Sequence, residues 1–270
     1  MVAIVAATSS AQGYNDNGDL VSYNTSTPTT PVVVPSSVYI FGDSQTSGRA
    51  GGATNSPADV LSLIWSASSL TPSVTINDYG VGGRSLAGTA SSFDSVSPAN
   101  PSWIHFQESG NQAHTGQTTP AEFGTTFETF VTNIDTTLSN ANTVISTETA
   151  FSFGREGSAN RNWDAYNTQL LNSVATLASS GITVYVANVD ANIKALGVHS
   201  DVTGAGDVWF QNGEANAYHY TSLGNLMVAL SMLDALRYDV DSLDLSTVPN
   251  EGNITSLRKT ACLDIIKGRV

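Results

Sequence analysis

Cysteine is almost absent from this sequence, because Cys262 is the single cysteine among 270 residues. One thiol cannot form an intrachain disulfide, and it cannot supply a CxxC redox motif or a zinc site built from several thiolates. The count therefore excludes a disulfide-stapled scaffold and a thiolate metal centre. We expect Cys262 to act as a small hydrophobic side chain near the C-terminal end.

Basic residues and long hydrophobic runs are also scarce. The chain has 10 Lys and Arg against 23 Asp and Glu, which gives a formal net charge of −13. Nucleic acid and anionic membrane surfaces would repel such a protein, so neither is expected as its main partner. No apolar stretch approaches the ~20 residues that span a bilayer, so no membrane span is expected.

The sequence does contain enough apolar material for one folded domain, since hydrophobic residues make up 40% of it. We expect a polar arm or leader remnant over 1–36, the folded domain over 37–240, and a C-terminal extension over 241–270 that packs on the domain or trails it. Residues 1–12 resemble the end of a signal peptide, although the basic n-region is missing. Together with a surface rich in Ser, Thr, Asn and Gly, this favours a secreted or surface-exposed protein.

Strand and helix patterns alternate along the predicted domain. Short buried-strand patterns occupy 38–41, 74–78, 149–153 and 182–189. Helix patterns occupy 57–70, 123–138, 163–177 and 223–236. The stretch 87–121 is predicted to be a long loop. The alternation predicts an α/β fold with a parallel sheet covered by helices on both faces, and a ligand site beyond the carboxyl ends of the strands.

Three of these strand ends carry unusual residues, namely Gly42-Asp43-Ser44, the cluster Gly80 to Gly83, and Gly154-Arg155-Glu156. Gly42-Asp43-Ser44 follows the first strand, and a serine in a sharp turn can serve as an exposed nucleophile, or it can simply cap a helix. Gly80, Gly82 and Gly83 follow the second strand, and their backbone N–H groups could bind an oxyanion. A plain turn is the alternative there. A dinucleotide-binding turn fits badly, because its third glycine is missing.

One of the four histidines stands out. His219 lies in an aromatic-rich turn just before a helix start, where a general base could face the strand ends. His105, His114 and His199 lie in polar, loop-like sequence and are expected at the surface. Their spacing is not that of metal ligands.

Four sequence blocks, in order, resemble the GDSL (SGNH) hydrolase family over residues 38–237. They are Val38-Tyr39-Ile40-Phe41-Gly42-Asp43-Ser44-Gln45-Thr46, Asp78-Tyr79-Gly80-Val81-Gly82-Gly83-Arg84-Ser85, Phe151-Ser152-Phe153-Gly154-Arg155-Glu156 and Asn216-Ala217-Tyr218-His219-Tyr220-Thr221-Ser222-Leu223-Gly224. The resemblance implies a flavodoxin-like three-layer α/β/α sandwich and hydrolysis of esters without a metal or other cofactor. Ser44 would be the nucleophile, His219 its base, and the Ser44 and Gly83 amides would hold the oxyanion.

The sequence departs from the family pattern at two positions. Glu156 stands where the third block usually has an asparagine that donates to the oxyanion, and Asn160 and Asn162 are the nearby residues that could replace that asparagine. Asn216 stands where the last block usually has an aspartate that orients the histidine, and Glu214 and Asp207 are the nearest acids that could replace it.

The resemblance leaves two functional hypotheses. The first is a serine ester hydrolase that acts on an acetylated carbohydrate or on a short-chain or lipid ester. Trp65, Trp103, Trp163 and Trp209 could stack on sugar rings, although Trp65 and Trp163 fall at helical core positions. The second hypothesis is a catalytically weak module of the same fold that binds a glycan or a protein, and the two departures support it.

Overall fold

The computed structural model describes most of the chain. The described residues are 30–48, 54–107, 118–138, 143–150, 163–202 and 219–268, together with the strand backbone of 8–14 and 20–26. Strands β1 (Thr8–Tyr14) and β2 (Leu20–Ser26), which fall in the segment expected as a polar arm, pair antiparallel in a sheet of their own.

The central sheet has five parallel strands in the order β4-β3-β5-β6-β7. They are β3 (Ser37–Gly42), β4 (Thr75–Gly80), β5 (Trp103–Gln107), β6 (Val144–Glu148) and β7 (Val184–Ala187). The first strand of this sheet thus lies inside it, with the second on one side and the third on the other. This is the flavodoxin-like order, in which the chain reverses direction across the sheet between β3 and β5.

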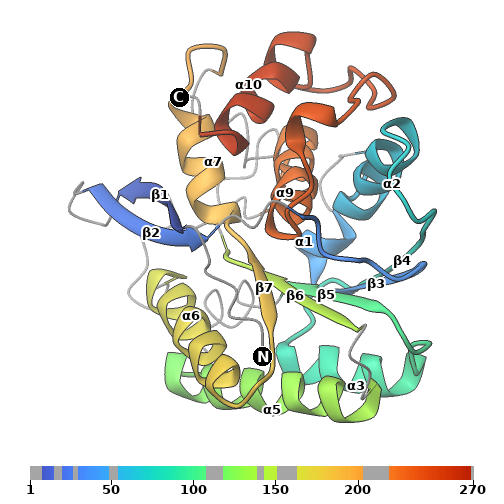
Figure 1. Ribbon diagram of the computed structural model, residues 1–270, viewed down its shortest axis with the longest axis vertical. Coiled ribbons are helices and arrows are strands. Elements are labelled where there is room, and N and C mark those ends of the chain that lie inside the picture. Colours follow the sequence, from blue (N-terminus) through green and yellow to red (C-terminus); the bar gives the residue numbers. More distant parts are fainter. Residues whose placement is uncertain are drawn as a thin grey trace.

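Helices cover both faces of the sheet, as Figure 1 shows. One face carries α3 (Leu86–Val96), α5 (Pro120–Leu138) and α6 (Trp163–Ser179). The other carries α2 (Pro57–Ala67), α7 (Val189–Gly197), α9 (Ser222–Ala235) and, further out, α10 (Ser256–Ile266). The short helix α1 (Ser44–Ser47) follows β3, and the 3₁₀ turn η1 (Val240–Ser242) follows α9. The predicted three-layer α/β/α architecture is confirmed.

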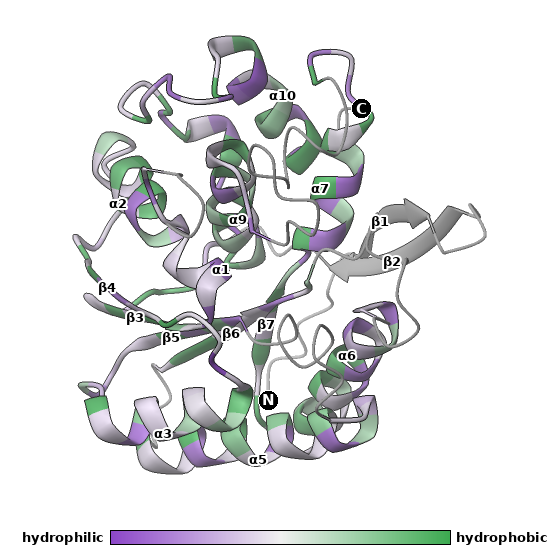
Figure 2. Ribbon diagram, turned by 180° about the vertical axis from the view of Figure 1, so that it is seen from behind, coloured by the Kyte–Doolittle hydropathy of each residue, from purple (hydrophilic) through white to green (hydrophobic). Residues whose placement is uncertain are grey.

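Each face of the sheet has its own hydrophobic core. Val38 and Ile40 of β3 pack into the core under α2, α7 and α9, while Phe41 packs into the core under α3, α5 and α6. Successive side chains of a strand point to opposite faces, so one short strand contributes to both cores. Helix α9 is buried on nearly all sides and is drawn mostly green in Figure 2, whereas α5 alternates between polar and apolar residues.

The helix expected over 57–70 is present as α2, which begins at Pro57. Ser56 is the N-cap and Pro57 is the first residue of the helix. The Ser56 hydroxyl accepts from the Asp59 N–H, and the Asp59 carboxylate accepts from the Ser56 N–H, which together form a capping box. This arrangement satisfies two backbone N–H groups that lack partners inside the helix.

Two expectations about secondary structure were wrong. Residues 87–121 are not one long loop, because α3 and the whole of β5 lie within this stretch. The third predicted strand, 149–153, is also misplaced, since β6 ends at Glu148. Both β5 and β6 are buried at every position, so neither shows the alternation of polar and apolar residues that identifies a half-buried strand.

The C-terminal segment is part of the packed structure. Helix α10 packs against α9 and α7, and Cys262 on α10 is fully buried. Burial raises the pKa of the Cys262 thiol, because the charged thiolate is poorly solvated there. Within the described residues, no helix is both long enough and apolar enough to cross a membrane.

We expect Cys262 to be unreactive toward a thiol reagent such as DTNB until the protein unfolds, because the reactive thiolate is both buried and disfavoured. The matched control is Leu257→Cys in a Cys262→Ser background, since Leu257 on the same helix is 66% exposed and should react at once. Thiol release is followed by absorbance with and without denaturant. Rapid labelling of the native wild-type protein would show that α10 does not pack as described.

Candidate active site

Ser44 is held at the carboxyl end of β3 by a tight turn. The strand ends at Gly42, Asp43 accepts a hydrogen bond from the Gln45 N–H at 2.8 Å, and Ser44 begins α1. The turn is so close that a Cβ on residue 42 would lie 2.7 Å from the Gln107 carbonyl oxygen. Only glycine fits at this position, so the turn that presents Ser44 depends on it.

His219 meets Ser44 from a distant part of the chain. Its Nε2 lies 2.9 Å from Ser44 Oγ, across 175 positions of sequence. His219 stands two residues before Thr221, the N-cap of α9, whose hydroxyl accepts from the Gly224 N–H. With the imidazole proton on Nδ1, Nε2 can accept the Ser44 hydroxyl proton. The sequence-predicted pair is therefore in hydrogen-bond contact.

The loop after β4 lies beside Ser44. The Val81 N–H donates to the Gly42 carbonyl at 3.0 Å, and the Arg84 guanidinium donates to the Tyr79 carbonyl at 2.6 Å. These bonds fix the loop against the end of β3. A Cβ on Gly82 would lie 3.8 Å from the Ser44 Cβ, so the loop backbone approaches the serine closely.

Gly83 belongs to the same loop and has a left-handed φ of 75°. Apart from Gly83 and its two chain neighbours, no heavy atom of the described residues lies within 4 Å of the place where its Cβ would be. The backbone of residue 83 is therefore open to an approaching molecule.

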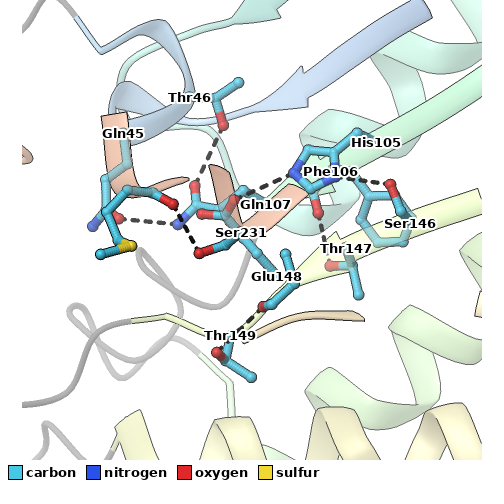
Figure 3. Close-up of polar contacts among 12 residues, drawn as sticks. Gln45, Thr46, His105, Phe106, Gln107, Ser146, Thr147, Glu148, Thr149 and Ser231 are labelled. Carbon is cyan, nitrogen blue, oxygen red and sulfur yellow. Dashed lines mark hydrogen bonds and ion pairs between the residues drawn. The ribbon is translucent and has the colours of Figure 1, made fainter. Parts of the chain in front are cut away.

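A layer of buried polar side chains runs through the sheet next to α1 (Figure 3). Gln107, the last residue of β5, donates to Gln45 Oε1 at 3.0 Å and accepts from the Thr46 hydroxyl at 3.4 Å. Gln107 also pairs in register with Gly42. These contacts tie the two residues after Ser44 to the neighbouring strand. Sequence reasoning missed Gln107, whose only signal is a polar residue at the end of a strand that was itself overlooked.

His105 is not a surface residue, which corrects the sequence-based expectation. It lies in the middle of β5, 1% exposed, with Nδ1 2.9 Å from Ser146 Oγ and Nε2 3.3 Å from Glu148 Oε2. Trp103 Nε1 also donates to Ser146 Oγ, at 2.6 Å. In the tautomer with the proton on Nε2, Ser146 donates to His105, and His105 donates to Glu148. These side chains then satisfy one another inside the sheet, which is why a buried histidine is tolerated.

The remaining predicted residues divide into three groups. Trp65, Trp103 and Trp163 are buried core residues, so the expectation that Trp103 could stack on a sugar was wrong. His199 is partly exposed, as expected, beside Asp201. The others lie outside the described residues: Glu156, Asn160, Asn162, Asp207, Glu214, Asn216, His114 and Trp209.

No metal centre was found in the part of the chain that the structure describes. There, no group of three or more His, Cys, Asp or Glu side chains could hold a metal ion. Among the described residues, the carboxyl end of β3 brings together a serine hydroxyl, an imidazole and the backbone of the loop after β4.

The fold and this pair of side chains define a class: an α/β/α protein with a serine and a histidine in hydrogen-bond contact at the carboxyl end of a parallel sheet. No protein-family model matches the sequence, and a search of curated proteins found no match. Solved structures do match.

Three of these structures illustrate the likeness. LAE5, an α/β-hydrolase enzyme from the metagenome of Lake Arreo, has a TM-score of 0.60 and 14% identity, covering 76% of this chain and 98% of that chain. An acetylxylan esterase from Geobacillus stearothermophilus has a TM-score of 0.58 and 13% identity, covering 78% and 98%. A putative lipolytic protein of the G-D-S-L family from Desulfitobacterium hafniense has a TM-score of 0.53 and 13% identity, covering 74% and 99%. The chain thus has the fold of GDSL (SGNH) ester hydrolases.

Gly80→Ala should disturb the site through the backbone. A Cβ there would clash with the backbone nitrogen of Ser47 and lie 2.8 Å from its Cα, so α1 or the loop must shift. Overpacking of this kind costs about 1–3 kcal/mol, which corresponds to a Tm lower by about 3–10 °C. Calorimetry measures the change, with Gly82→Ala as the control.

The control differs because the Cβ of Gly82→Ala would make only an ordinary 3.8 Å contact. Its Tm should therefore stay close to that of the wild type. Equal Tm values for the two variants would contradict the described approach of β4 to α1.

Proposed function

We propose that this protein is a serine ester hydrolase in which Ser44 is the nucleophile and His219 is the general base. The observation that carries the proposal is the 2.9 Å contact between His219 Nε2 and Ser44 Oγ at the carboxyl end of an interior strand. A hydrogen-bonded serine and base at this place is the arrangement that nucleophilic acyl transfer requires. The fold shared with esterases and lipolytic proteins supports the same reaction class.

The proposed reaction has two halves. Ser44 Oγ attacks the ester carbonyl while His219 Nε2 takes the hydroxyl proton, and the resulting imidazolium then protonates the leaving alcohol. A water molecule, deprotonated by His219, next attacks the acyl carbon. The bond from that carbon to Ser44 Oγ breaks, His219 returns the proton to Ser44 Oγ, and the acid is released. The Ser44 and Gly83 backbone N–H groups would stabilise the oxyanion in both halves.

A further oxyanion donor is best sought after β5. The strand order places β5 directly beside β3, whereas β6 is two strand spacings, or about 10 Å, away. Past Gln107 the sequence continues as Glu108-Ser109-Gly110-Asn111, while Glu156 follows β6. We therefore propose Asn111, rather than Glu156, as the side-chain donor. The strand order carries this proposal, and both residues lie outside the described part of the chain.

The proposed substrate is a neutral or weakly charged O-acyl ester, either an acetylated carbohydrate or a short-chain or lipid ester. A formal net charge of −13 disfavours polyanionic substrates. One structural neighbour is an acetylxylan esterase, which favours the carbohydrate ester. Secretion or surface display, suggested by the leading residues, would bring the protein to such a polymer.

Ser44→Ala and His219→Ala should each lower kcat at least about 10⁴-fold, because each removes half of the reacting pair. Rates are measured on p-nitrophenyl acetate and on an acetylated xylan. Reaction of Ser44 with a fluorophosphonate is located by peptide mass spectrometry. The matched controls are Ser95→Ala and His199→Ala. Among the described residues, the Ser95 hydroxyl donates to the Ser91 carbonyl and the partly exposed His199 accepts from the Asp201 N–H.

The outcome also decides between the two functional hypotheses. A folded wild-type protein that neither hydrolyses these esters nor reacts at Ser44, yet binds the glycan, would be the catalytically weak binding module. Wild-type turnover in either folded variant would contradict the serine mechanism itself.

Asn111→Ala should lower kcat about 10²–10³-fold with little change in KM, because an oxyanion donor acts in the transition state. Glu156→Ala should leave kcat near the wild-type value. Asn133→Ala, which removes a partly exposed amide on α5 that donates to Asp94, is the control. Kinetics on p-nitrophenyl acetate distinguish the variants, and a loss confined to Glu156→Ala would overturn the proposed donor.

A further inference from the structure

Asn225 is a fully buried amide in a helix that is otherwise packed mostly with apolar side chains. It lies in the first turn of α9, where its backbone N–H donates to the Thr221 carbonyl at 2.9 Å. A buried amide costs stability unless its polar atoms are hydrogen bonded. Its Oδ1 has no hydrogen-bond partner among the described residues, so the contacts of Nδ2 must account for its presence.

The Asn225 amide reaches the segment that carries the nucleophile. Nδ2 donates to the Gly48 carbonyl at 3.2 Å and to the Asn55 carbonyl at 2.7 Å. Gly48 is the C-cap of α1, and its own N–H donates to the Ser44 carbonyl at 3.2 Å. Gly48 thus connects Asn225 to the nucleophile, because it accepts a hydrogen bond from Asn225 and donates one to Ser44.

The other end of this connection leads to the base. Thr221, which accepts the Asn225 backbone N–H, is only two residues after His219. The Asn225 side chain therefore links the short helix that begins with Ser44 to the first turn of the helix that His219 precedes. These two segments are far apart in sequence and belong to no common strand ladder.

The segment before α10 makes hydrogen bonds with Asn55 on one side of this link and with the start of α9 on the other. Glu251 accepts from Asn55 Nδ2 at 2.6 Å, and Asn253 accepts from the Leu223 N–H at 3.1 Å. Asn253 also donates to Thr221 Oγ1 at 3.0 Å. The C-terminal segment therefore fixes Asn55, whose carbonyl accepts from Asn225, and it also fixes the first turn of α9, which carries Asn225.

We propose that Asn225 is a positioning residue that holds α9 against α1, so that His219 Nε2 stays within hydrogen-bond distance of Ser44 Oγ. The proposal rests on the proposed serine hydrolase function. A misplacement of about 1 Å in a catalytic group can cost 10²-fold in rate. Loss of the link should therefore lower kcat and leave the binding of substrate largely intact.

Asn225→Ala tests the proposal against Ser231→Ala. Ser231 lies on the same helix and is equally buried. Among the described residues its hydroxyl accepts from Asn192 Nδ2 of α7 at 2.9 Å and donates to the Met227 carbonyl of its own helix, and neither partner belongs to α1. Both variants lose a buried polar contact, so both should have a lower Tm. Only Asn225→Ala should lower kcat, by about 10–100-fold, with KM changed less than about threefold. Its Ser44 should react with a fluorophosphonate more slowly by a similar factor.

Asn225→Ser is the second variant, because its hydroxyl keeps one donor and leaves a smaller void. Its kcat should fall between those of the wild type and Asn225→Ala, and it decides the question if the alanine variant does not fold. All rates are measured well below the lowest Tm. Hydrogen exchange should rise in peptides covering 43–48 and 219–225 in the Asn225 variants, but not in Ser231→Ala.

Two outcomes would overturn the proposal, and they are distinguishable. An active wild type with Asn225 variants that keep its kcat, or that lose no more than Ser231→Ala, would leave Asn225 a purely structural residue. A wild type that neither turns over esters nor reacts at Ser44 would instead overturn the serine hydrolase function on which the proposal rests.

Discussion

The hydrogen bond between Ser44 Oγ and His219 Nε2 joins two segments that are 175 residues apart. Its length depends on the end of β3, on the turn at Gly42 and on the start of α9, each of which is set by different packing. Gly42 lies between Gly80 on one neighbouring strand and Gln107 on the other, so the end of β3 cannot move independently of β4 or β5. A small shift in any of these elements would separate the two side chains. The packing of β3, β4, β5 and α9 therefore maintains the distance between Ser44 Oγ and His219 Nε2.

The polar groups buried around this point share one property, which is that their partners lie on other elements. Gln107 on β5 bonds residues of α1, Asn225 on α9 bonds the end of α1, and His105 bonds two side chains of β6. A hydrophobic contact tolerates sliding, whereas a buried hydrogen bond is lost when its partner moves, at the full cost of desolvating both groups. Such bonds therefore fix the relative placement of elements that apolar packing alone would leave less well defined.

Two hydrophobic cores, one on each face of the sheet, meet at strands that contribute side chains to both. This arrangement explains why β5 and β6 are buried at every position and why polar side chains within them need partners inside the sheet. It also explains why α9 is mostly apolar. The helix is enclosed by the sheet, α2, α7 and α10, so almost none of its surface faces solvent. The C-terminal segment completes this enclosure and contacts the turns on both sides of the proposed catalytic pair.

The sequence by itself determined those features whose signals are local. The run from Val38 to Ser44, the start of α2 at Pro57 and the apolar pattern of α9 each depend on neighbouring residues, and each was predicted correctly. The pairing of Ser44 with His219 was predicted from a family resemblance, and the structure places them in contact.

Only the tertiary structure decided the features whose causes are not local. The strand β5 was missed because burial on both faces removes the alternation by which a strand is recognised, and His105 was therefore assigned to the surface. The strand order showed that β5, and not β6, lies beside the nucleophile strand. Nothing in the sequence near Asn225 indicates its role, because its partners Gly48 and Asn55 are 177 and 170 positions away. A contact over such a distance has no periodicity or spacing to reveal it, and it exists only once the sheet has brought α1 and α9 together.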